Sequence, residues 1–195
     1  PGIKATIHEG PHYQMLDILR EGYVNMVILY SSVASRLAEF QYHLLVKDSI
    51  IVVANPEMLS FHSAHHAPGY RYPVIDPMEL SEHPYIKNSS INPTAEFIDS
   101  ALSQNGLNLE DNIYLQIGRT CTVVQLASAT VGFGFSPSLQ ISSQVPEKCK
   151  FMLPHGFFPP YNLYALLPAG NTWNASERIF IDYVRESLKD SVLFG

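Results

Sequence analysis

The chain has 195 residues, 46% hydrophobic and 15% charged, which indicates a globular protein of one domain or two small ones. Twelve Lys and Arg against 18 Asp and Glu give a formal net charge of −6, which argues against a surface that itself grips nucleic acid phosphates. No apolar run reaches the about 20 residues that span a bilayer, and the start, PGIKATIHEG, lacks a signal-peptide core. We therefore expect a soluble, cytoplasmic protein in which Cys121 and Cys149 are free thiols.

The N-terminal third predicts a strand, a helix and a second strand. Residues 2–8 alternate apolar and polar side chains, as in a half-buried strand. A helix should begin after Gly10 and Pro11 and end at Gly22, and the apolar run 24–30 should form a strand covered on both faces. Such short connections predict parallel strands with a right-handed crossover. An irregular link should lead to strands at 44–46 and 50–54.

The middle of the chain contains the same pattern twice: a strand, a polar loop with hydroxyls, and a helix. A His-, Pro- and Gly-rich surface loop at 55–77 and a helical turn at 76–80 precede it. The first copy has a strand at 84–87 and a helix that is capped by Asn92, starts at Pro93 and ends at Gly106. The second has a strand at 112–117 and a helix from Thr120 to Gly132, followed by an apolar run at 133–136. Both predict a parallel sheet, and the N–H groups of each strand-to-helix turn suit a small anionic ligand.

The C-terminal third predicts a weakly structured stretch at 138–150, a strand at 151–153, a hinge in PHGFFPP, and a strand at 161–167. The final helix should be capped by Asn174 with Glu177 three residues later, and should present Phe180, Tyr183, Val184 and Leu188 on one apolar face. Hinges near Val74 and Pro159 divide the chain into residues 1–74 plus 160–195 and residues 75–159, with a cleft between the halves.

Several motifs occur in an order that resembles the effector-binding domain of LysR-type transcriptional regulators over essentially the whole chain. They are PGIKATIHEG followed by LDILREGYVNMVIL, then LLVKDSIIVVANP, DPMELSEHPYI and ATVGFGFSP, and last an aliphatic-aromatic strand with a C-terminal helix. The sequence departs from the family at Asn25, where Asp is usual, and at Pro137, which follows the Gly-x-Gly closely. The family's first strand and helix, which precede the Pro-Gly, are also missing from the pattern.

The resemblance implies an α/β fold of two Rossmann-like subdomains joined by two crossover segments, like the type 2 periplasmic binding proteins. It also implies a dimer or tetramer in which a small-molecule effector in the cleft acts allosterically on an N-terminal winged helix-turn-helix that binds DNA. That DNA-binding module is not in this sequence, which agrees with its acidic balance. The resemblance implies neither catalysis, nor a cofactor, nor a membrane partner.

Residues at the carboxyl ends of the predicted strands are the candidate effector ligands. Helix starts supply N–H donors, hydroxyls add short polar contacts, and Lys87 or Arg119 could pair with a carboxylate. Helix capping alone would also account for the Ser, Thr and Asn residues. The candidates are Tyr30, Ser31, Lys87, Asn88, Ser89, Ser90, Gly118, Arg119, Thr120 and Cys121.

Two other features suggest different chemistry. His62, His65 and His66 would form a transition-metal site if helical, but the neighbouring Pro68 and Gly69 favour a loop without metal. Cys121 at a helix start would have a lowered thiol pKa, which suits a nucleophile, but no histidine lies close in sequence. The alternatives to a regulator are therefore a solute-binding protein of a transport system, which predicts an upstream secretion signal, and an enzyme sensitive to thiol alkylation or chelation.

Overall fold

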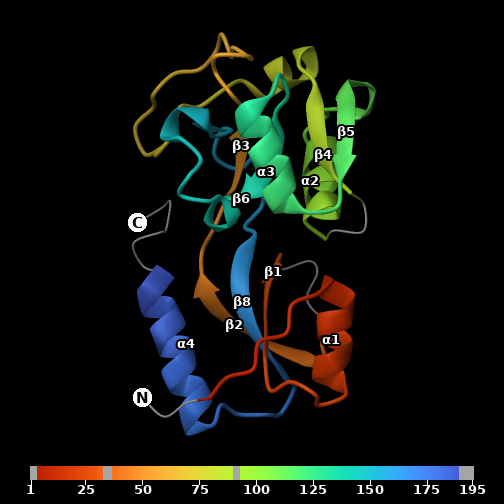
Figure 1. Ribbon diagram of the computed structural model, residues 1–195, viewed down its shortest axis with the longest axis vertical. Helices are drawn as coiled ribbons and strands as arrows, with labels where there is room; N and C mark the ends of the chain where they lie inside the picture. The colour runs from red at the N-terminus through yellow and green to blue at the C-terminus, as the bar shows by residue number, and fades with distance from the viewer. Residues whose placement is uncertain (1–3, 33–36, 90–92, 189–195) are drawn as a thin grey trace. The chain divides into compact units, whose positions relative to one another are not determined.

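The computed structural model describes residues 4–32, 37–89 and 93–188 (Figure 1). The chain divides into two compact units: Pro1–Lys47 with Asn162–Val192, and Asp48–Tyr161 with Leu193–Gly195. The changeover at Tyr161–Asn162 lies close to the hinge expected near Pro159. The other lies at Lys47–Asp48 instead of near Val74, because the strand Ile50–Val53 pairs within the second unit.

The first unit is a three-stranded antiparallel sheet with two helices. The strands β1 (Val27–Ser31), β8 (Asn162–Pro168) and β2 (Phe40–Val46) lie in the order β1-β8-β2. Helix α1 (His12–Arg20) packs on one face through a cluster of buried residues: Leu16, Leu19, Val27, Phe40, Tyr164 and Leu166. Helix α4 (Ala175–Leu188) packs on β2, on the other side of the sheet (Figure 1).

The parallel β-α-β arrangement predicted for the N-terminal third is wrong. Residues 4–8 are exposed and form no strand, and β1 pairs antiparallel with β8. The alternating pattern does not suffice because a strand needs a neighbour to accept its backbone hydrogen bonds, and no described strand pairs with this segment. The prediction that β1 is covered on both faces also fails, since Ile28 is 39% exposed.

Strand β2 is longer than predicted because pairing with β8 organises it. The expected strand at 44–46 extends back to Phe40, and the register runs from Phe40 opposite Pro168 to Val46 opposite Leu163. The polar residues Gln41 and His43 are accommodated since successive side chains point to opposite faces of the sheet.

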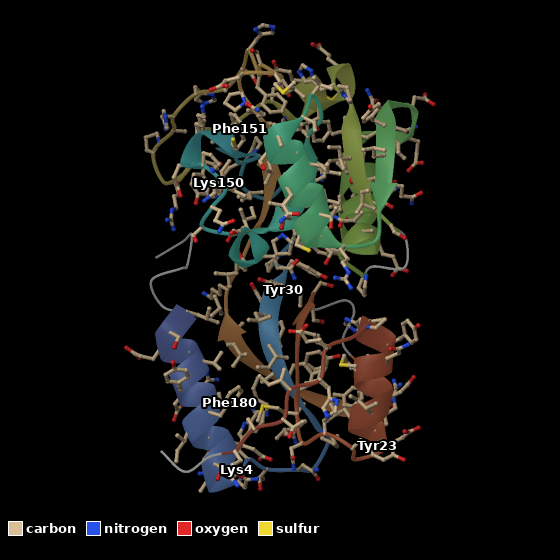
Figure 2. The ribbon with its side chains drawn as sticks, viewed as in Figure 1. Lys4, Tyr23, Tyr30, Lys150, Phe151 and Phe180 are labelled. Carbon is tan, nitrogen blue, oxygen red and sulfur yellow. The ribbon has the colours of Figure 1, made fainter. Side chains whose placement is uncertain are left out.

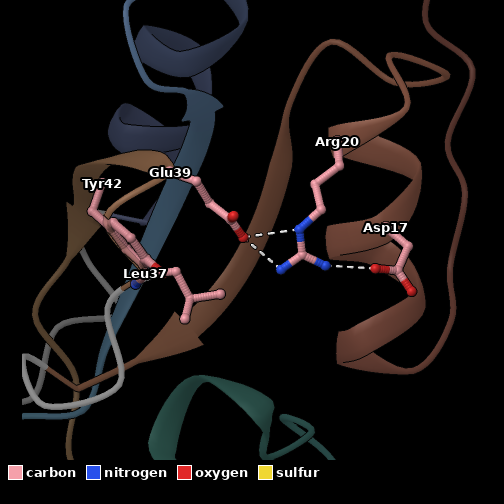
Figure 3. Close-up of polar contacts among 5 residues, drawn as sticks. All are labelled: Asp17, Arg20, Leu37, Glu39 and Tyr42. Atoms are coloured by element: carbon pink, nitrogen blue, oxygen red, sulfur yellow. Dashed lines mark hydrogen bonds and ion pairs between the residues drawn. The ribbon is translucent and has the colours of Figure 1, made fainter.

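An ion-pair cluster connects α1 to the residues that precede β2 (Figure 3). Arg20 donates from Nε to Glu39 Oε1 at 2.8 Å and from Nη1 to Asp17 Oδ1 at 2.5 Å, and its guanidinium lies 5.4 Å from the Phe40 ring centroid. The Leu37 N–H donates to the Tyr42 hydroxyl at 3.1 Å. All the charged groups of this cluster are solvent-exposed, so they orient the segment more than they stabilise the fold.

The capping box predicted for α4 is confirmed. The Asn174 N–H donates to Glu177 Oε2 at 2.8 Å, and the Glu177 N–H donates to Asn174 Oδ1 at 3.0 Å. The predicted apolar face is wrong in part, because Tyr183 is 71% exposed and Ile181 is the buried residue of this helix. The helix lies along the edge of a small sheet, which covers only a narrow stripe of it.

The second unit contains a three-stranded antiparallel sheet, a two-stranded parallel sheet and two helices. Its strands are β3 (Ile50–Val53), β4 (Tyr85–Asn88), β5 (Ile113–Ile117), β6 (Gly134–Pro137) and β7 (Lys150–Phe151). Its helices are α2 (Pro93–Gln104) and α3 (Thr120–Ala129), with short 3-10 turns η2 (Pro77–Glu82), η3 (Glu110–Asn112), η4 (Ser138–Gln140) and η5 (Glu147–Cys149).

The parallel sheet predicted for the middle of the chain is confirmed. Strands β4 and β5 pair in parallel, and Phe133 forms a parallel bridge to Tyr85 just before β6. Strand β6 then pairs antiparallel with β3, and β3 with β7. Helix α3 ends at Ala129, earlier than the expected stop at Gly132. The expected cap Asn92 lies outside the described residues.

Gly132 and Gly134 allow helix α3 and strand β4 to approach the chain closely. A Cβ on Gly134 would lie 2.5 Å from Val123 Cγ1, and one on Gly132 would lie 2.9 Å from Ile86 Cγ1 and 3.2 Å from the Pro84 carbonyl. The Gly-x-Gly of the family motif therefore has a packing role here. Next to it, the rings of Tyr85, Phe133 and Phe135 form the aromatic part of the core.

Candidate functional site

The turn between β5 and α3 presents the start of a helix to solvent. Intrahelical hydrogen bonding begins with the N–H groups of Thr122 and Val123, which both donate to the Arg119 carbonyl at 3.1 and 3.2 Å. The N–H groups of Thr120 and Cys121 precede this ladder, at the positive end of the helix dipole. This geometry suits an anion or a polar oxygen of a ligand.

Asn88 fixes the position of this helix start. Its side chain is 1% exposed; its Nδ2 donates to the Phe135 carbonyl at 3.2 Å, and its Oδ1 accepts from Thr120 Oγ1 at 3.2 Å. One amide thus connects β4, β6 and α3. The Ser89 N–H donates to the Ile117 carbonyl at 2.7 Å, which holds the end of β4 beside the end of β5. The two predicted strand-to-helix turns are therefore neighbours.

The surface of the turn is open. Nothing lies within 4 Å of a Cβ built on Gly118, so there is unfilled space at this glycine, two residues before α3. Arg119 and the free thiol Cys121 are exposed beside it. Arg119 forms no ion pair within residues 4–32, 37–89 and 93–188. The turn thus combines an exposed guanidinium with the backbone N–H groups of a helix start.

Lys87 lies on the other face of β4. Its neighbour Asn88 points toward α3, whereas the Lys87 Nζ lies 3.0 Å from Asp99 Oδ2 on α2 and 2.6 Å from Glu110 Oε1 in η3. Burial by itself lowers the pKa of Lys87, but hydrogen bonds to Glu110 and Asp99 outweigh it, and the net pKa is raised. The charge of this lysine is thus balanced within the chain.

The remaining predicted ligands lie elsewhere. Tyr30 and Ser31 belong to the first unit, at the carboxyl end of β1 (Figure 2), and Ser31 is buried with its Oγ donating to the Ser32 carbonyl at 3.0 Å. Ser90 lies outside the described residues. Of the other described candidates, Lys87 and Asn88 are the last two residues of β4, and Ser89, Gly118, Arg119, Thr120 and Cys121 follow β4 and β5. Asn88 and Thr120 are in direct contact.

The histidine-rich loop is held by a carboxylate that sequence reasoning missed. Glu79 of η2 is buried and accepts hydrogen bonds from the N–H groups of His62 and Ser63 and from Ser63 Oγ, which itself accepts from the Asp76 N–H. Burial raises the pKa of Glu79, but the hydrogen bonds from Ser63 and His62 outweigh it, and the net pKa is lowered. The DPMEL motif contains this residue, but only the tertiary contact reveals its role.

The three histidines of that loop are exposed and not helical, so His62 and His66 do not share a helix face. Across the described part of the chain, no group of three or more His, Cys, Asp or Glu side chains is arranged to hold a metal ion. Both cysteines are free thiols, as expected. None of the helices within the described ranges combines the length and the apolar character that crossing a bilayer requires.

The model of the LysR substrate binding domain family matches residues 1–189, and the chain belongs to this family. The fold is accordingly of the type 2 periplasmic-binding-protein-like α/β kind. LysR substrate-binding domains belong to transcription regulators, which are not enzymes. This finding removes the support for an enzyme that uses Cys121 and for a transport receptor. No curated protein matches the chain.

Solved structures of LysR-type domains share the fold at low sequence identity. The regulatory domain of CcmR from Synechocystis PCC6803, in complex with 2-PG, is similar at a TM-score of 0.71 and 15% identity, over 97% of this chain and 86% of that one. The effector binding domain of QuiR, in complex with shikimate, is similar at 0.66 and 17%, over 94% and 81%. The LysR family regulator HinK from Pseudomonas aeruginosa is similar at 0.69 and 17%, over 95% and 60%.

Proposed function

We propose that this effector-binding domain recognises a small anionic metabolite at the turn formed by Gly118, Arg119, Thr120 and Cys121 together with the neighbouring Asn88 and Ser89. The observation that carries the proposal is the start of α3, where the N–H groups of Thr120 and Cys121 precede the intrahelical hydrogen bonds, next to the exposed Arg119 and the unfilled space at Gly118. The CcmR and QuiR domains, whose fold this chain shares, bind 2-PG and shikimate.

Each residue has a distinct role in the proposed site. Arg119 pairs with the anionic group, Thr120 and Cys121 contribute N–H donors, and Ser89 adds a polar contact. Asn88 positions the helix start through its bond to Thr120. Lys87 balances Asp99 and Glu110 and supports β4 from the α2 side. Tyr30 and Ser31, the last two residues of β1, and Ser90, two positions after the last residue of β4, remain proposed ligands, because ligands of α/β folds bind at the carboxyl ends of strands.

The proposed signal passes beyond the domain. We propose that effector binding shifts the geometry of a homodimer or tetramer in the cytoplasm. A winged helix-turn-helix on the N-terminal side of this domain then binds DNA differently. The effector acts only through a difference in affinity for two arrangements of the same assembly. The net charge of −6 supports the proposal that another module contacts DNA, because a negatively charged domain does not attract phosphates.

A thermal-shift screen of anionic metabolites, starting with 2-PG and shikimate, tests the site. A bound effector should raise the melting temperature by an amount set by its concentration and affinity. Gly118→Leu should abolish the shift of any hit, because the side chain fills the open space, while Gly118→Ala should weaken it less. Thr120→Ala and Ser89→Ala should each weaken binding.

Two controls separate blocked binding from damaged folding. Cys149→Ser changes the buried thiol and should leave the affinity unchanged, whereas Cys121→Ser changes the exposed thiol at the turn. If hits stabilise Gly118→Leu, Thr120→Ala and Ser89→Ala as much as the unaltered chain, the effector binds elsewhere. If cationic metabolites, screened beside the anions, stabilise the chain more than the anions do, the proposed anion specificity is wrong.

A further inference from the structure

The contact between His43 and Trp173 joins the sheet of the first unit to the segment that leads into α4. The ring centroids lie 4.8 Å apart at an interplanar angle of 62°, in an edge-to-face arrangement. His43 Nε2 is buried and has no hydrogen-bond partner among the described residues. A neutral imidazole tolerates this environment, whereas an imidazolium would place an N–H and a positive charge there without an acceptor.

Few contacts attach α4 to the sheet. Ile181 is the buried residue of the helix, and Arg185 Nη2 donates to the Leu44 carbonyl of β2 at 2.9 Å. The Arg178 Nε donates to the Trp173 carbonyl at 3.2 Å, which ties the helix to the segment before it. Because the attachment depends on so few groups, a change in the charge of one of them has a large relative effect.

The charged surroundings of His43 disfavour its protonation. Burial lowers the pKa of His43, and the positive charge of Arg185 lowers it further. The other charged side chains of the facing helix within its described length are Glu177, Arg178, Asp182 and Glu186, and Asp182 Oδ1 lies 3.9 Å from Arg185 Nη1. Ala165, which lies opposite His43 on β8, is apolar, and residues 169–173 before Asn174 carry no charged side chain. The structure therefore offers the protonated ring a cation on α4 and no partner on β8.

We propose that His43 is a pH-sensitive latch, in which protonation of its imidazole loosens Trp173 and helix α4 from strand β2. The direction follows from the contacts. The packed arrangement holds the neutral ring, so acidification through the ordinary histidine range, about pH 6.5, favours the loosened state because only there is the ring solvated. Above that range the latch is closed.

Trp173 is the single tryptophan of the sequence, so the tryptophan fluorescence comes from this position. Acrylamide quenching measures how accessible the indole is, independently of any direct effect of the imidazolium on its emission. Between about pH 7.5 and about pH 5, we expect the quenching constant to rise about twofold or more as α4 loosens. The hydrogen-exchange protection of α4 amides, taken relative to the intrinsic rates at each pH, should fall over the same range, while α1 serves as the internal reference.

Two variants test whether His43 is the group that titrates. His43→Phe keeps an aromatic ring against Trp173 but cannot be protonated, and His43→Gln serves if the phenylalanine disturbs folding. Both should show a quenching constant that does not change with pH, whereas His65→Gln, which alters an exposed histidine of the second unit, should behave like the unaltered chain. A flat quenching profile in the unaltered chain, or an equal rise in His43→Phe, overturns the proposal.

Discussion

The two units of the chain hold their polar side chains in different ways. Within the described residues, the second unit buries eight polar or charged residues and the first buries one, Ser31. Those of the second unit are Asp48, Glu79, Lys87, Asn88, Thr94, Thr120, Ser136 and Lys150. The first unit instead combines an apolar cluster under α1 with ion pairs on its surface, such as Arg20 with Glu39 and Asp17.

In the second unit, buried hydrogen bonds specify how the helices, strands and loops are arranged. A buried donor or acceptor must find its partner, so each buried bond selects one arrangement of the elements that carry it. Asn88 does this for β4, β6 and α3, and Glu79 does it for the loop that contains His62 and Ser63. The candidate site lies in the unit with the buried network, where a helix start can be held at a defined position.

The strongest test of this contrast is the packing around Gly134. Gly134→Ala forces a Cβ against Val123 Cγ1 at 2.5 Å, and we expect it to lower the free energy of unfolding by about 1–3 kcal/mol. Gly118→Ala adds the same methyl group in open space and should change it far less. Urea denaturation followed by far-UV circular dichroism measures both, and equal midpoints for the two variants would contradict the close packing.

The second test removes the buried amide of the network. Asn88→Ala leaves the Phe135 carbonyl and the Thr120 hydroxyl without that partner, at an expected cost of about 1–3 kcal/mol in the free energy of unfolding. The matched control is Gln125→Ala, an exposed amide on α3, which should stay within about 0.5 kcal/mol of the unaltered chain. If the two variants unfold at the same urea concentration, the Asn88 bonds contribute nothing to stability.

The third test uses pH. The pKa of Glu79 is lowered below its ordinary value of 4.5, so the folded chain binds a proton at this carboxylate less readily than the unfolded chain does. This contribution is therefore complete above that ordinary value and is lost as the pH falls through the lowered folded-state pKa. Acid titration of the urea midpoint should show the loss, and Glu79→Gln should flatten this part of the profile. An unchanged acid profile in Glu79→Gln would show that another carboxylate is responsible.

The smallest expected effect belongs to the first unit. Arg20→Ala breaks the exposed pairs with Glu39 and Asp17 shown in Figure 3, and we expect little change in the urea midpoint because water and salt screen these charges. The fluorescence of Trp173, which lies in this unit, follows its unfolding. A large loss of stability that vanishes at high salt would mean that the surface ion pairs matter more than the comparison suggests.

The sequence alone determined the features that depend on local chemistry. The capping box of Asn174 and Glu177, the turn at Pro77–Glu82, and the strands that lead into α2 and α3 all follow from side chains within a few residues of one another. The strand-helix-strand pattern with short connections also predicted the parallel pairing of β4 with β5. The same rule failed in the N-terminal third, where residues 4–8 form no strand. The motif order indicated the family, which the match over residues 1–189 confirmed.

Which segments pair as strands depends on the tertiary structure. Residues 4–8 carry a strand pattern but pair with no described strand, whereas Phe40 and Gln41 carry a weak one and become β2 because β8 lies beside them. Lys87 and Asn88 are adjacent in sequence, yet one bonds to acids on the α2 side and the other to the start of α3. Backbone pairing and the choice of face depend on residues far away in the chain, and a local pattern contains no information about them.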